Sequence, residues 1–367
     1  MVEWKKLGDA CAFNRGKTIT AKDAVDGDIP VIAGGQTPSY YHNEFNREGE
    51  SITVAGSGAY AGFVSYWNQP IFVSDAFTID PLKGLKHKYL FHWAKMNQGR
   101  IIATQKGAGV PHVHGKDIAK FLIPIPSLSE QQRIVSILDT FTSSISNLKQ
   151  QIEERRKQYE YERDLLLDLE GKEGVEMKKL GEVCTFSQGI QVPVEQQILE
   201  KKEGYCRFLR IIDFTQGEEP PRYVPISDKN YYVDVDDIAM VRYGSPGFVC
   251  VGKRGIIANN LFKVNIINSD FVTKLFLACL LKSKLFQKQI KQKSLGGALQ
   301  AISFGLLRNI ILPFPPLSTQ SRIVSILDTF EQSISNLEEQ LAMREKQYEY
   351  YRNQLLTFEG EEERGKT

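Results

Sequence analysis

The sequence lacks the features that mark several large classes of protein. Its 367 residues contain no apolar run near the roughly 18–20 residues of a membrane span, and Lys5 and Lys6 are followed by no apolar segment of the signal-peptide type. The five cysteines are widely spaced and form no C-x-x-C pair, which argues against a disulfide framework and against a zinc site. We therefore expect a cytoplasmic protein whose cysteines are reduced.

Motifs of catalysis are missing as well. Residues 56–61 match G-x-G-x-x-A, but Gly-Phe-Val-Ser follows where a dinucleotide-binding fold needs a helix. Residues 109–116 are one residue too long for a phosphate-binding loop, and Asp117 stands where Ser or Thr is required. No Asn-Pro-Pro or Asp-Pro-Pro motif of amino-methyltransferases occurs, and no Cys or carboxylate cluster joins His112 and His114. The sequence predicts no catalytic residue and no metal site.

The most informative feature that is present is a long internal repeat. The nonapeptide RIVSILDTF begins at Arg133 and again at Arg322, 189 positions later, and residues 124–167 match residues 313–356 at 29 of 44 positions without a gap. The segment VEWKKLG at residues 2–8 recurs as VEMKKLG at residues 175–181. Between these ends the copies differ, and the second has 16 extra residues. The chain is a tandem duplication in which the two copies are alike at their ends and different in between.

Apolar residues in the repeated segment recur every three or four positions, which predicts two long helices with a coiled-coil seam. The predicted seam residues are Ile134, Leu138, Phe141, Ile145, Leu148, Ile152, Tyr159 and Leu166, then Ile323, Leu327, Phe330, Ile334, Leu337, Leu341, Tyr348 and Leu355. Some 40 residues at about 1.5 Å each make a rod about 60 Å long. Arg155 and Glu162 interrupt the seam in the first helix, and Arg344 and Tyr351 stand at the same places in the second. We expect the two arginines to help fix the register. The alternative is an amphipathic helix that lies on its own domain.

The repeat and the seam together predict the architecture. We expect an α+β fold in which two mixed α/β globular domains are joined by two long helices that form an antiparallel coiled coil, with an internal pseudo-two-fold repeat. Ser129, with Gln132 three residues later, resembles a capping box at the start of the first helix. The predicted boundaries are 1–128 for the first domain, 129–170 for the first helix, 171–317 for the second domain, 318–358 for the second helix and 359–367 for a charged tail.

The distribution of charge favours a nucleic-acid partner more than the net charge of +2 does. Residues 81–120 hold eight Lys or Arg against one acid, and residues 242–310 hold eleven against one. Both globular domains therefore have a basic half at matching positions, as a surface that follows phosphates needs. A solvated, lysine-rich face is the alternative for either run alone.

Reading bases also needs donors and acceptors of mixed type on loops. For any single residue, solvation or turn formation explains its presence equally well, so the prediction concerns the set. The candidates are Tyr40, Tyr41, His42, Ser57, Tyr60, Lys106, His112 and His114 in the first copy, and Arg242, Tyr243, Ser245, Lys253, Arg254, Asn259, Asn260, Lys293 and Gln300 in the second.

This alternation of variable domains with near-identical helices resembles the specificity subunits of type I restriction-modification systems over the whole length of the chain. The helix entry Pro-x-Leu-x-Glu-Gln adds to the resemblance at residues 126–131, whereas residues 315–320 have Thr319 where the motif has Glu. The resemblance implies two target-recognition domains, each of which reads one half of a bipartite, asymmetric double-stranded DNA target. It also implies that the helices set the spacing and dock two methyltransferase subunits, and through them the restriction subunits.

In this interpretation the chain itself is not an enzyme and carries no cofactor. S-adenosylmethionine, ATP and Mg²⁺ are expected on the partner subunits. Two alternatives from other classes remain at this stage. One is a DNA nuclease or methyltransferase with a diverged motif, and the other is a structural tether with two protein-binding domains.

Overall fold

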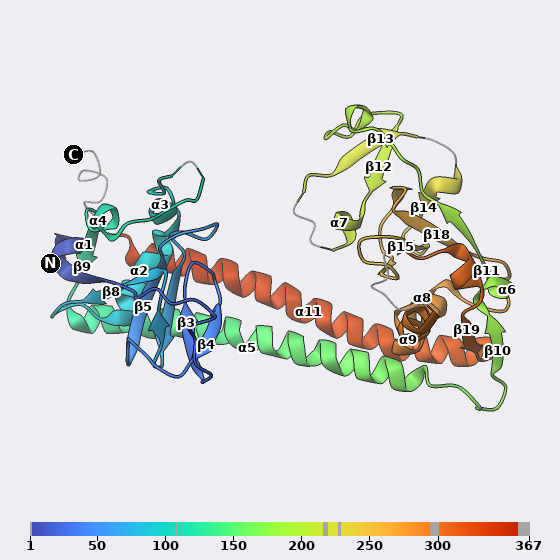
Figure 1. The fold of residues 1–367 in the computed structure, drawn as a ribbon, viewed down its shortest axis with the longest axis horizontal. Coiled ribbons are helices and arrows are strands. Elements are labelled where there is room, and N and C mark those ends of the chain that lie inside the picture. Colours follow the sequence, from blue (N-terminus) through green and yellow to red (C-terminus); the bar gives the residue numbers. More distant parts are fainter. Residues whose placement is uncertain (1, 108, 216–218, 227–228, 294–300, 359–367) are drawn as a thin grey trace. The chain divides into compact units, whose positions relative to one another are not determined.

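The computed structural model of the chain describes residues 2–107, 109–215, 219–226, 229–293 and 301–358 (Figure 1). The chain divides into two compact units. The first unit combines Met1–Gln150 with Glu338–Thr367, and the second unit is Gln151–Leu337. Each unit therefore contains one globular domain together with a part of each long helix.

The first unit contains two sheets and a short antiparallel pair formed by its first and last strands. Its elements are β1 (Glu3–Lys6), α1 (Leu7–Ala10), β2 (Cys11–Arg15), β3 (Ile29–Ile32), β4 (Tyr40–His42), β5 (Glu50–Ala55), β6 (Val64–Asn68), β7 (Phe72–Val73), β8 (Ala76–Pro81), α2 (His87–Met96), α3 (Gln98–Ile102), α4 (Gly115–Ile118) and β9 (Leu122–Ile125), followed by the long helix α5 (Leu128–Leu166). The main sheet has the order β2-β8-β5-β6, with antiparallel neighbours, and a smaller sheet has the order β4-β3-β7.

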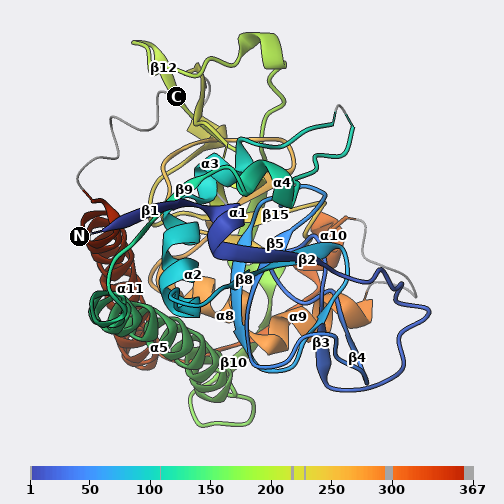
Figure 2. The ribbon, with the colours of Figure 1, turned by 90° about the vertical axis from the view of Figure 1, so that its left-hand side faces the viewer.

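Helix α2 packs against the main sheet and encloses the core of the first unit (Figure 2). The alternation of β5 directs Ile52 and Val54 into this core, where both are fully buried beside Trp93 of α2. On the opposite face of β5, the hydroxyl of Thr53 accepts a hydrogen bond of 2.9 Å from the indole of Trp67. Both faces of the central strand are therefore covered.

The second unit repeats this plan with an insertion. Its elements are β10 (Glu176–Lys179), α6 (Leu180–Val183), β11 (Cys184–Gln188), η1 (Val194–Gln196), β12 (Tyr205–Leu209), α7 (Ile211–Phe214), β13 (Arg222–Pro225), η2 (Lys229–Tyr231), β14 (Tyr232–Val233), β15 (Ile238–Val241), β16 (Val249–Cys250), β17 (Gly255–Ile257), β18 (Leu261–Ile266), α8 (Lys274–Lys282), α9 (Lys284–Lys293), α10 (Phe304–Arg308) and β19 (Ile311–Phe314), followed by the long helix α11 (Leu317–Leu356).

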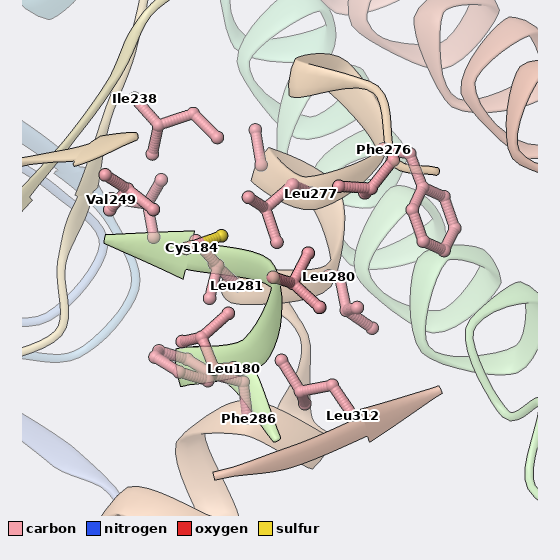
Figure 3. Close-up of a cluster of buried hydrophobic side chains, with 14 of the residues drawn as sticks. Leu180, Cys184, Ile238, Val249, Phe276, Leu277, Leu280, Leu281, Phe286 and Leu312 are labelled. Atoms are coloured by element: carbon pink, nitrogen blue, oxygen red, sulfur yellow. The ribbon is translucent and has the colours of Figure 1, made fainter. Parts of the chain in front are cut away.

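The two units share one topology. The order β11-β18-β15-β16 corresponds to β2-β8-β5-β6, and the parallel pair β12–β17 corresponds to β3–β7. Strand β14, which pairs with β17, corresponds in the first unit to a single antiparallel bridge between Arg47 and Ile71, the residue before β7. Figure 3 shows the core of the second unit, where Leu180, Cys184 and Phe276 converge from three different elements. The repeat in the sequence is therefore a repeat of the whole domain frame.

The long helices pack antiparallel within each unit. In the first unit the ring of Phe141 stacks on that of Tyr351 at 5.3 Å, and Lys149 forms an ion pair of 2.9 Å with Glu345. In the second unit the hydroxyl of Tyr159 donates to Glu331 at 2.7 Å. In both units, positions late in one helix meet positions early in the other.

All sixteen predicted seam residues are buried or half-buried. The first turns of each helix also belong to a domain core, because Ile134 and Leu138 pack into the core of the first unit and Ile323 and Leu327 into that of the second. The two interpretations of the seam therefore describe different stretches of the same helices: the domain covers the start of each helix, and the other helix covers the middle.

The starts of the helices differ from the expected ones by one residue. Helix α5 begins at Leu128, and the hydroxyl of Ser127, not that of Ser129, accepts the capping hydrogen bond from the Glu130 amide at 3.3 Å. The ends also come earlier than expected, at Leu166 and Leu356 instead of residues 170 and 358. The predicted Ser129–Gln132 capping box is wrong because the helix already includes both residues.

A glutamine at the fourth helical position anchors each long helix to its domain. The side-chain amide of Gln131 donates to the Gly84 and Pro126 carbonyls at 2.9 Å each and accepts from the Lys86 amide at 2.9 Å. Gln320 makes the same three bonds, donating to the carbonyls of Phe271 and Pro315 and accepting from the Thr273 amide. Both side chains are fully buried. The glutamine of the entry motif thus has the same structural role in both copies.

None of the helices formed by the described residues is both long and apolar enough to cross a membrane. All five cysteines are free, and three of them, Cys11, Cys184 and Cys250, are buried. Burial raises the pKa of each of these three thiols to about 12, so they are protonated at neutral pH and behave as small apolar side chains.

Candidate nucleic-acid interface

Two loops of the first unit join beyond the end of β5. The Gly58 amide donates to the Pro111 carbonyl and the Val113 amide to the Gly56 carbonyl, each at 3.0 Å, while the backbones of Lys106 and His112 exchange hydrogen bonds of 2.9 and 2.8 Å. These bonds bring the predicted residues Ser57, Tyr60, Lys106, His112 and His114 into one cluster, although some 50 positions separate the two loops in the sequence.

The side chains of this cluster are mixed in character. Tyr60 is 50% exposed, and the rings of His112 and His114 are nearly parallel, with centroids 6.4 Å apart and planes at 4°. Ser57 donates a hydrogen bond to Asp75, and Lys106 forms an ion pair of 2.7 Å with Asp117.

Charge in the cluster is partly compensated. The hydrogen bond from Lys106 holds the pKa of Asp117 below its usual value, so this carboxylate is ionised at neutral pH. A phosphate that approaches Lys106 therefore has to compete with Asp117.

The other candidates of the first copy lie on the smaller sheet. Tyr41 is 56% exposed, whereas the hydroxyl of Tyr40 donates to the Ile19 carbonyl at 2.7 Å. His42 is only 7% exposed, accepts a bond of 3.0 Å from the Val25 amide and packs edge-on against Phe72. The alternation of β4 turns this ring inward, so little of the His42 surface is accessible for the predicted contact with DNA.

In the second unit the equivalent loop follows β15. The Arg242 amide donates to the Asn260 carbonyl at 2.8 Å, the hydroxyl of Tyr243 donates to the Asn259 carbonyl at 3.2 Å, and the Ile302 amide donates to the Arg242 carbonyl at 2.9 Å. The last bond matches the one between Val113 and Gly56. The structure therefore groups Arg242, Tyr243, Asn259 and Asn260 at the site that corresponds to the first cluster.

The remaining candidates of the second copy are more scattered. Ser245 is exposed in the loop after β15. Arg254, in the turn between β16 and β17, pairs with the Asp234 carboxylate at 2.8 Å, and Lys253 in the same turn donates to the backbone carbonyl of Asp213. Lys293 is the last residue of α9, and its side chain is outside the described part of the chain, as is the whole of Gln300.

In the folded chain, many cations of the two basic runs (residues 81–120 and 242–310) are paired with carboxylates, so the runs carry less free positive charge than the sequence indicates. Carboxylates, most of them from outside the runs, neutralise many of their cations, as in Lys88–Asp139 at 2.5 Å, Lys263–Asp237 at 2.6 Å and Lys284–Asp164 at 3.3 Å. Burial lowers the pKa of Lys95 to about 8, and its ammonium lies over the ring of Phe63. A count of lysines along the chain therefore overstates the surface available to phosphates.

Two residues beside the clusters, at the ends of β2 and β11, are not among the residues predicted to contact DNA. Arg15 ends β2, and its counterpart Gln188 accepts a hydrogen bond of 2.6 Å from the Arg242 guanidinium. The signal was a glycine that follows in both copies: a Cβ on Gly16 or on Gly189 would lie 2.2 Å from a backbone oxygen of the neighbouring loop. These glycines let the loop pass close to the strand end beside each cluster.

Comparisons with known proteins agree with this architecture. The family model for the type I restriction modification DNA specificity domain matches residues 1–155 and 172–343. The EcoR124I/EcoR124II specificity subunit of Escherichia coli is 27% identical over 394 residues, which cover 97% of this chain and 94% of that protein.

Two solved structures share the fold. The type I restriction-modification S subunit from M. genitalium has a TM-score of 0.63 at 19% identity, with 97% of both chains covered. A chain from a structure of type I system assembly and conformational transition has a TM-score of 0.57 at 19% identity, also with 97% of both chains covered. The chain therefore belongs to the type I restriction modification DNA specificity family, with two copies of the domain in tandem.

Proposed function

We propose that each globular domain reads one half of a bipartite, asymmetric double-stranded DNA target. This proposal rests on the observation that the two units share their strands and helices but differ in the residues of their loops. Strands, helices and the glutamine anchor repeat in both units, yet Gly56 and Ser57 of one cluster correspond to Arg242 and Tyr243 of the other. Different side chains at equivalent positions read different bases, so the two half-sites differ in sequence.

The helices set the spacing of the half-sites and dock two methyltransferase subunits. Support comes from their antiparallel packing, because two near-identical helices that run in opposite directions offer the same surface twice. Helices of 39 and 40 residues are about 60 Å long, which exceeds the roughly 34 Å between half-sites one DNA turn apart. S-adenosylmethionine, ATP and Mg²⁺ belong to the partner methyltransferase and restriction subunits.

The decisive experiment is modification-sensitive long-read sequencing of the source genome with and without this gene. We expect one split, asymmetric methylated motif to disappear with the gene. Exchange of residues 2–123 for the corresponding part of a relative should then change one half of the motif and leave the other. A change of both halves together would contradict the proposal that each domain reads one half of the target.

The chain acts without catalysis of its own. Purified chain incubated with DNA, Mg²⁺ and S-adenosylmethionine should neither cleave nor methylate, and methylation should start when the methyltransferase subunit is added. Turnover by the chain alone would favour the alternative of an enzyme with a diverged motif. Binding to DNA that weakens as salt rises would separate the proposal from a structural tether.

A further inference from the structure

A cleft of about 370 Å³ opens beside the loop cluster of the first unit. Its walls include Phe13 and Phe77, whose ring centroids are 6.2 Å apart, together with His112 and His114, and Arg15 and Lys116 line it as well. This volume falls within the roughly 300–1,000 Å³ typical of small-molecule sites. Aromatic walls with two cations suit a flat, anionic ligand better than an aliphatic one.

The same place in the second unit is filled by the protein itself. Phe186 and Phe262 take the positions of Phe13 and Phe77, and Phe304 takes that of Gly115. The ring of Phe304 stacks on Phe186 at 5.6 Å and 20° and meets Phe262 edge-on at 5.3 Å and 77°. The second unit thus packs a planar ring against both of these aromatic side chains.

A second substitution closes the site in the second unit. Arg242, the counterpart of Gly56, places its guanidinium 5.8 Å from the centre of the Phe304 ring. In the first unit both positions are glycine, and both glycines line the cleft. The first unit therefore lacks the ring and the cation that the second unit supplies from its own chain, and it keeps a different cation, Arg15, at the end of β2.

We propose that the cleft of the first unit binds a nucleotide, with the nucleobase against Phe13 and Phe77 and the phosphate at Arg15 and Lys116. Every nucleobase has a π-face that stacks on aromatic rings, and the imidazoles of His112 and His114 can donate to or accept from its edge. Two sources share this chemistry: a free mononucleotide, and an unstacked nucleotide of bound DNA. The second source rests on the proposed function.

The test uses the full-length chain and its variants in titration calorimetry with the four deoxynucleoside monophosphates and with single-stranded DNA octamers. Gly56→Arg with Gly115→Phe fills the cleft as in the second unit. Because a Cβ on Gly115 would lie 2.9 Å from the ring of Phe13, a second variant, Arg15→Ala with Lys116→Ala, removes the cations without a change in packing. Lys22→Ala, an exposed lysine outside the cleft, is the matched control, and thermal unfolding verifies that each variant is folded.

We expect the variant with the filled cleft to bind the probe more weakly by roughly 5- to 150-fold, the range that one stacked base contributes. The variant without the two cations should also bind more weakly, and the control should bind as wild type does. A loss seen with mononucleotides assigns a free nucleotide as the source, and a loss seen only with octamers assigns a DNA base. Equal binding of both probes by the wild-type chain and the folded cleft variants overturns the inference. Loss of the methylated motif on deletion of the gene is measured separately, so the proposed function can stand while this inference fails.

Discussion

The side-chain oxygen of Gln131 accepts a hydrogen bond of 2.9 Å from the backbone amide of Lys86, at the residue that precedes α2. Gln320 does the same for the amide of Thr273, which precedes α8. One glutamine in each copy therefore connects the start of a long helix to the start of the helix that covers the domain core.

Replacement of this glutamine should destabilise the chain. Gln131→Ala removes three hydrogen bonds and leaves one amide and two carbonyls without that partner, so we expect the free energy of unfolding to fall by about 1–3 kcal/mol. Gln320→Ala should have a similar effect in the second unit. Urea unfolding measures both. Gln132→Ala is the control, since this neighbour is exposed, and an equal loss in the control would contradict the anchoring role.

Equivalent carboxylates in the two units should respond to substitution in opposite directions. Burial alone would raise the pKa of Asp139, but hydrogen bonds from His92 and Lys88 outweigh it and hold the pKa below the usual value. Asp139→Asn should therefore lower stability at pH 7 by about 1 kcal/mol, a value reduced for solvent screening. Because the stabilising carboxylate is lost as pH falls through and below about 4, the variant should approach wild type there.

The corresponding residue of the second unit is Asp328, and none of the described residues donates a comparable hydrogen bond to its carboxylate. Burial, followed by the charge of Glu331, raises its pKa above the usual value. The folded state disfavours the charged form, so stability increases as pH falls and the residue becomes protonated. Asp328→Asn should raise the unfolding midpoint at pH 7 and have little effect near pH 3. Thermal unfolding from pH 3 to 8 tests both variants, and shifts of the same sign at pH 7 would refute the contrast.

Removal of an acid should strengthen DNA binding if the first cluster contacts phosphates. Asp117 pairs with Lys106 at 2.7 Å and lies 3.7 Å from Lys120. Asp117→Ala frees both cations, so affinity should rise and log K should fall more steeply with log salt, by roughly 0.9 for each new phosphate contact. Lys106→Ala should act in the opposite direction. Asp26→Ala, an exposed acid elsewhere in the unit, controls for net charge; an equal gain there would argue against a local contact.

The two arginines in the seam should affect register more than stability. Arg155 lies 6.0 Å from the ring centre of Phe330, and Arg344 lies 5.7 Å from that of Phe141. Leu at both positions removes cation–π contacts worth about 0.5–1 kcal/mol each but places an apolar side chain at one interruption of the seam in each helix, so the unfolding midpoint should change little.

The expected result is instead a loss of a unique register. Spin labels at Asn147 and Lys346, both exposed and both in the first unit, should give one narrow distance in the wild-type chain and a second population in the double Leu variant. A single unchanged distance would show that the arginines do not fix the register.

The long helices can be predicted from the sequence because apolar residues recur at a helical period. The duplication can be predicted because the two copies are nearly identical at their ends. Every predicted seam position is at least half-buried, since a spacing of 3.5 residues keeps one stripe on the inner face. The anchor Gln131 could not be found in this way. Its partners Gly84 and Lys86 come from a turn some 45 positions away, and only the tertiary fold brings them together.

The site was harder to predict for a similar reason. A short segment such as Tyr40–His42 shows alternation but does not reveal which face is inside, and His42 proved to face the core. The ion pairs of the basic runs could not be predicted either, because the acids that form them, such as Asp139 and Asp237, lie outside the runs in the sequence. The aromatic ring of Phe304 became informative only when the fold aligned it with Gly115.

The two units draw on different parts of the sequence, and this sets the order in which they can fold during translation. Leu356, near the end of the chain, is fully buried in the same core as Leu7, near its start. About 200 residues separate Gln150 from Leu356, which a ribosome needs roughly 10–40 s to add. The second unit is complete when Leu337 has been made, so the domain translated first is the last to close. A ribosome that stops within the final helix would release a finished second domain attached to an unfinished first one.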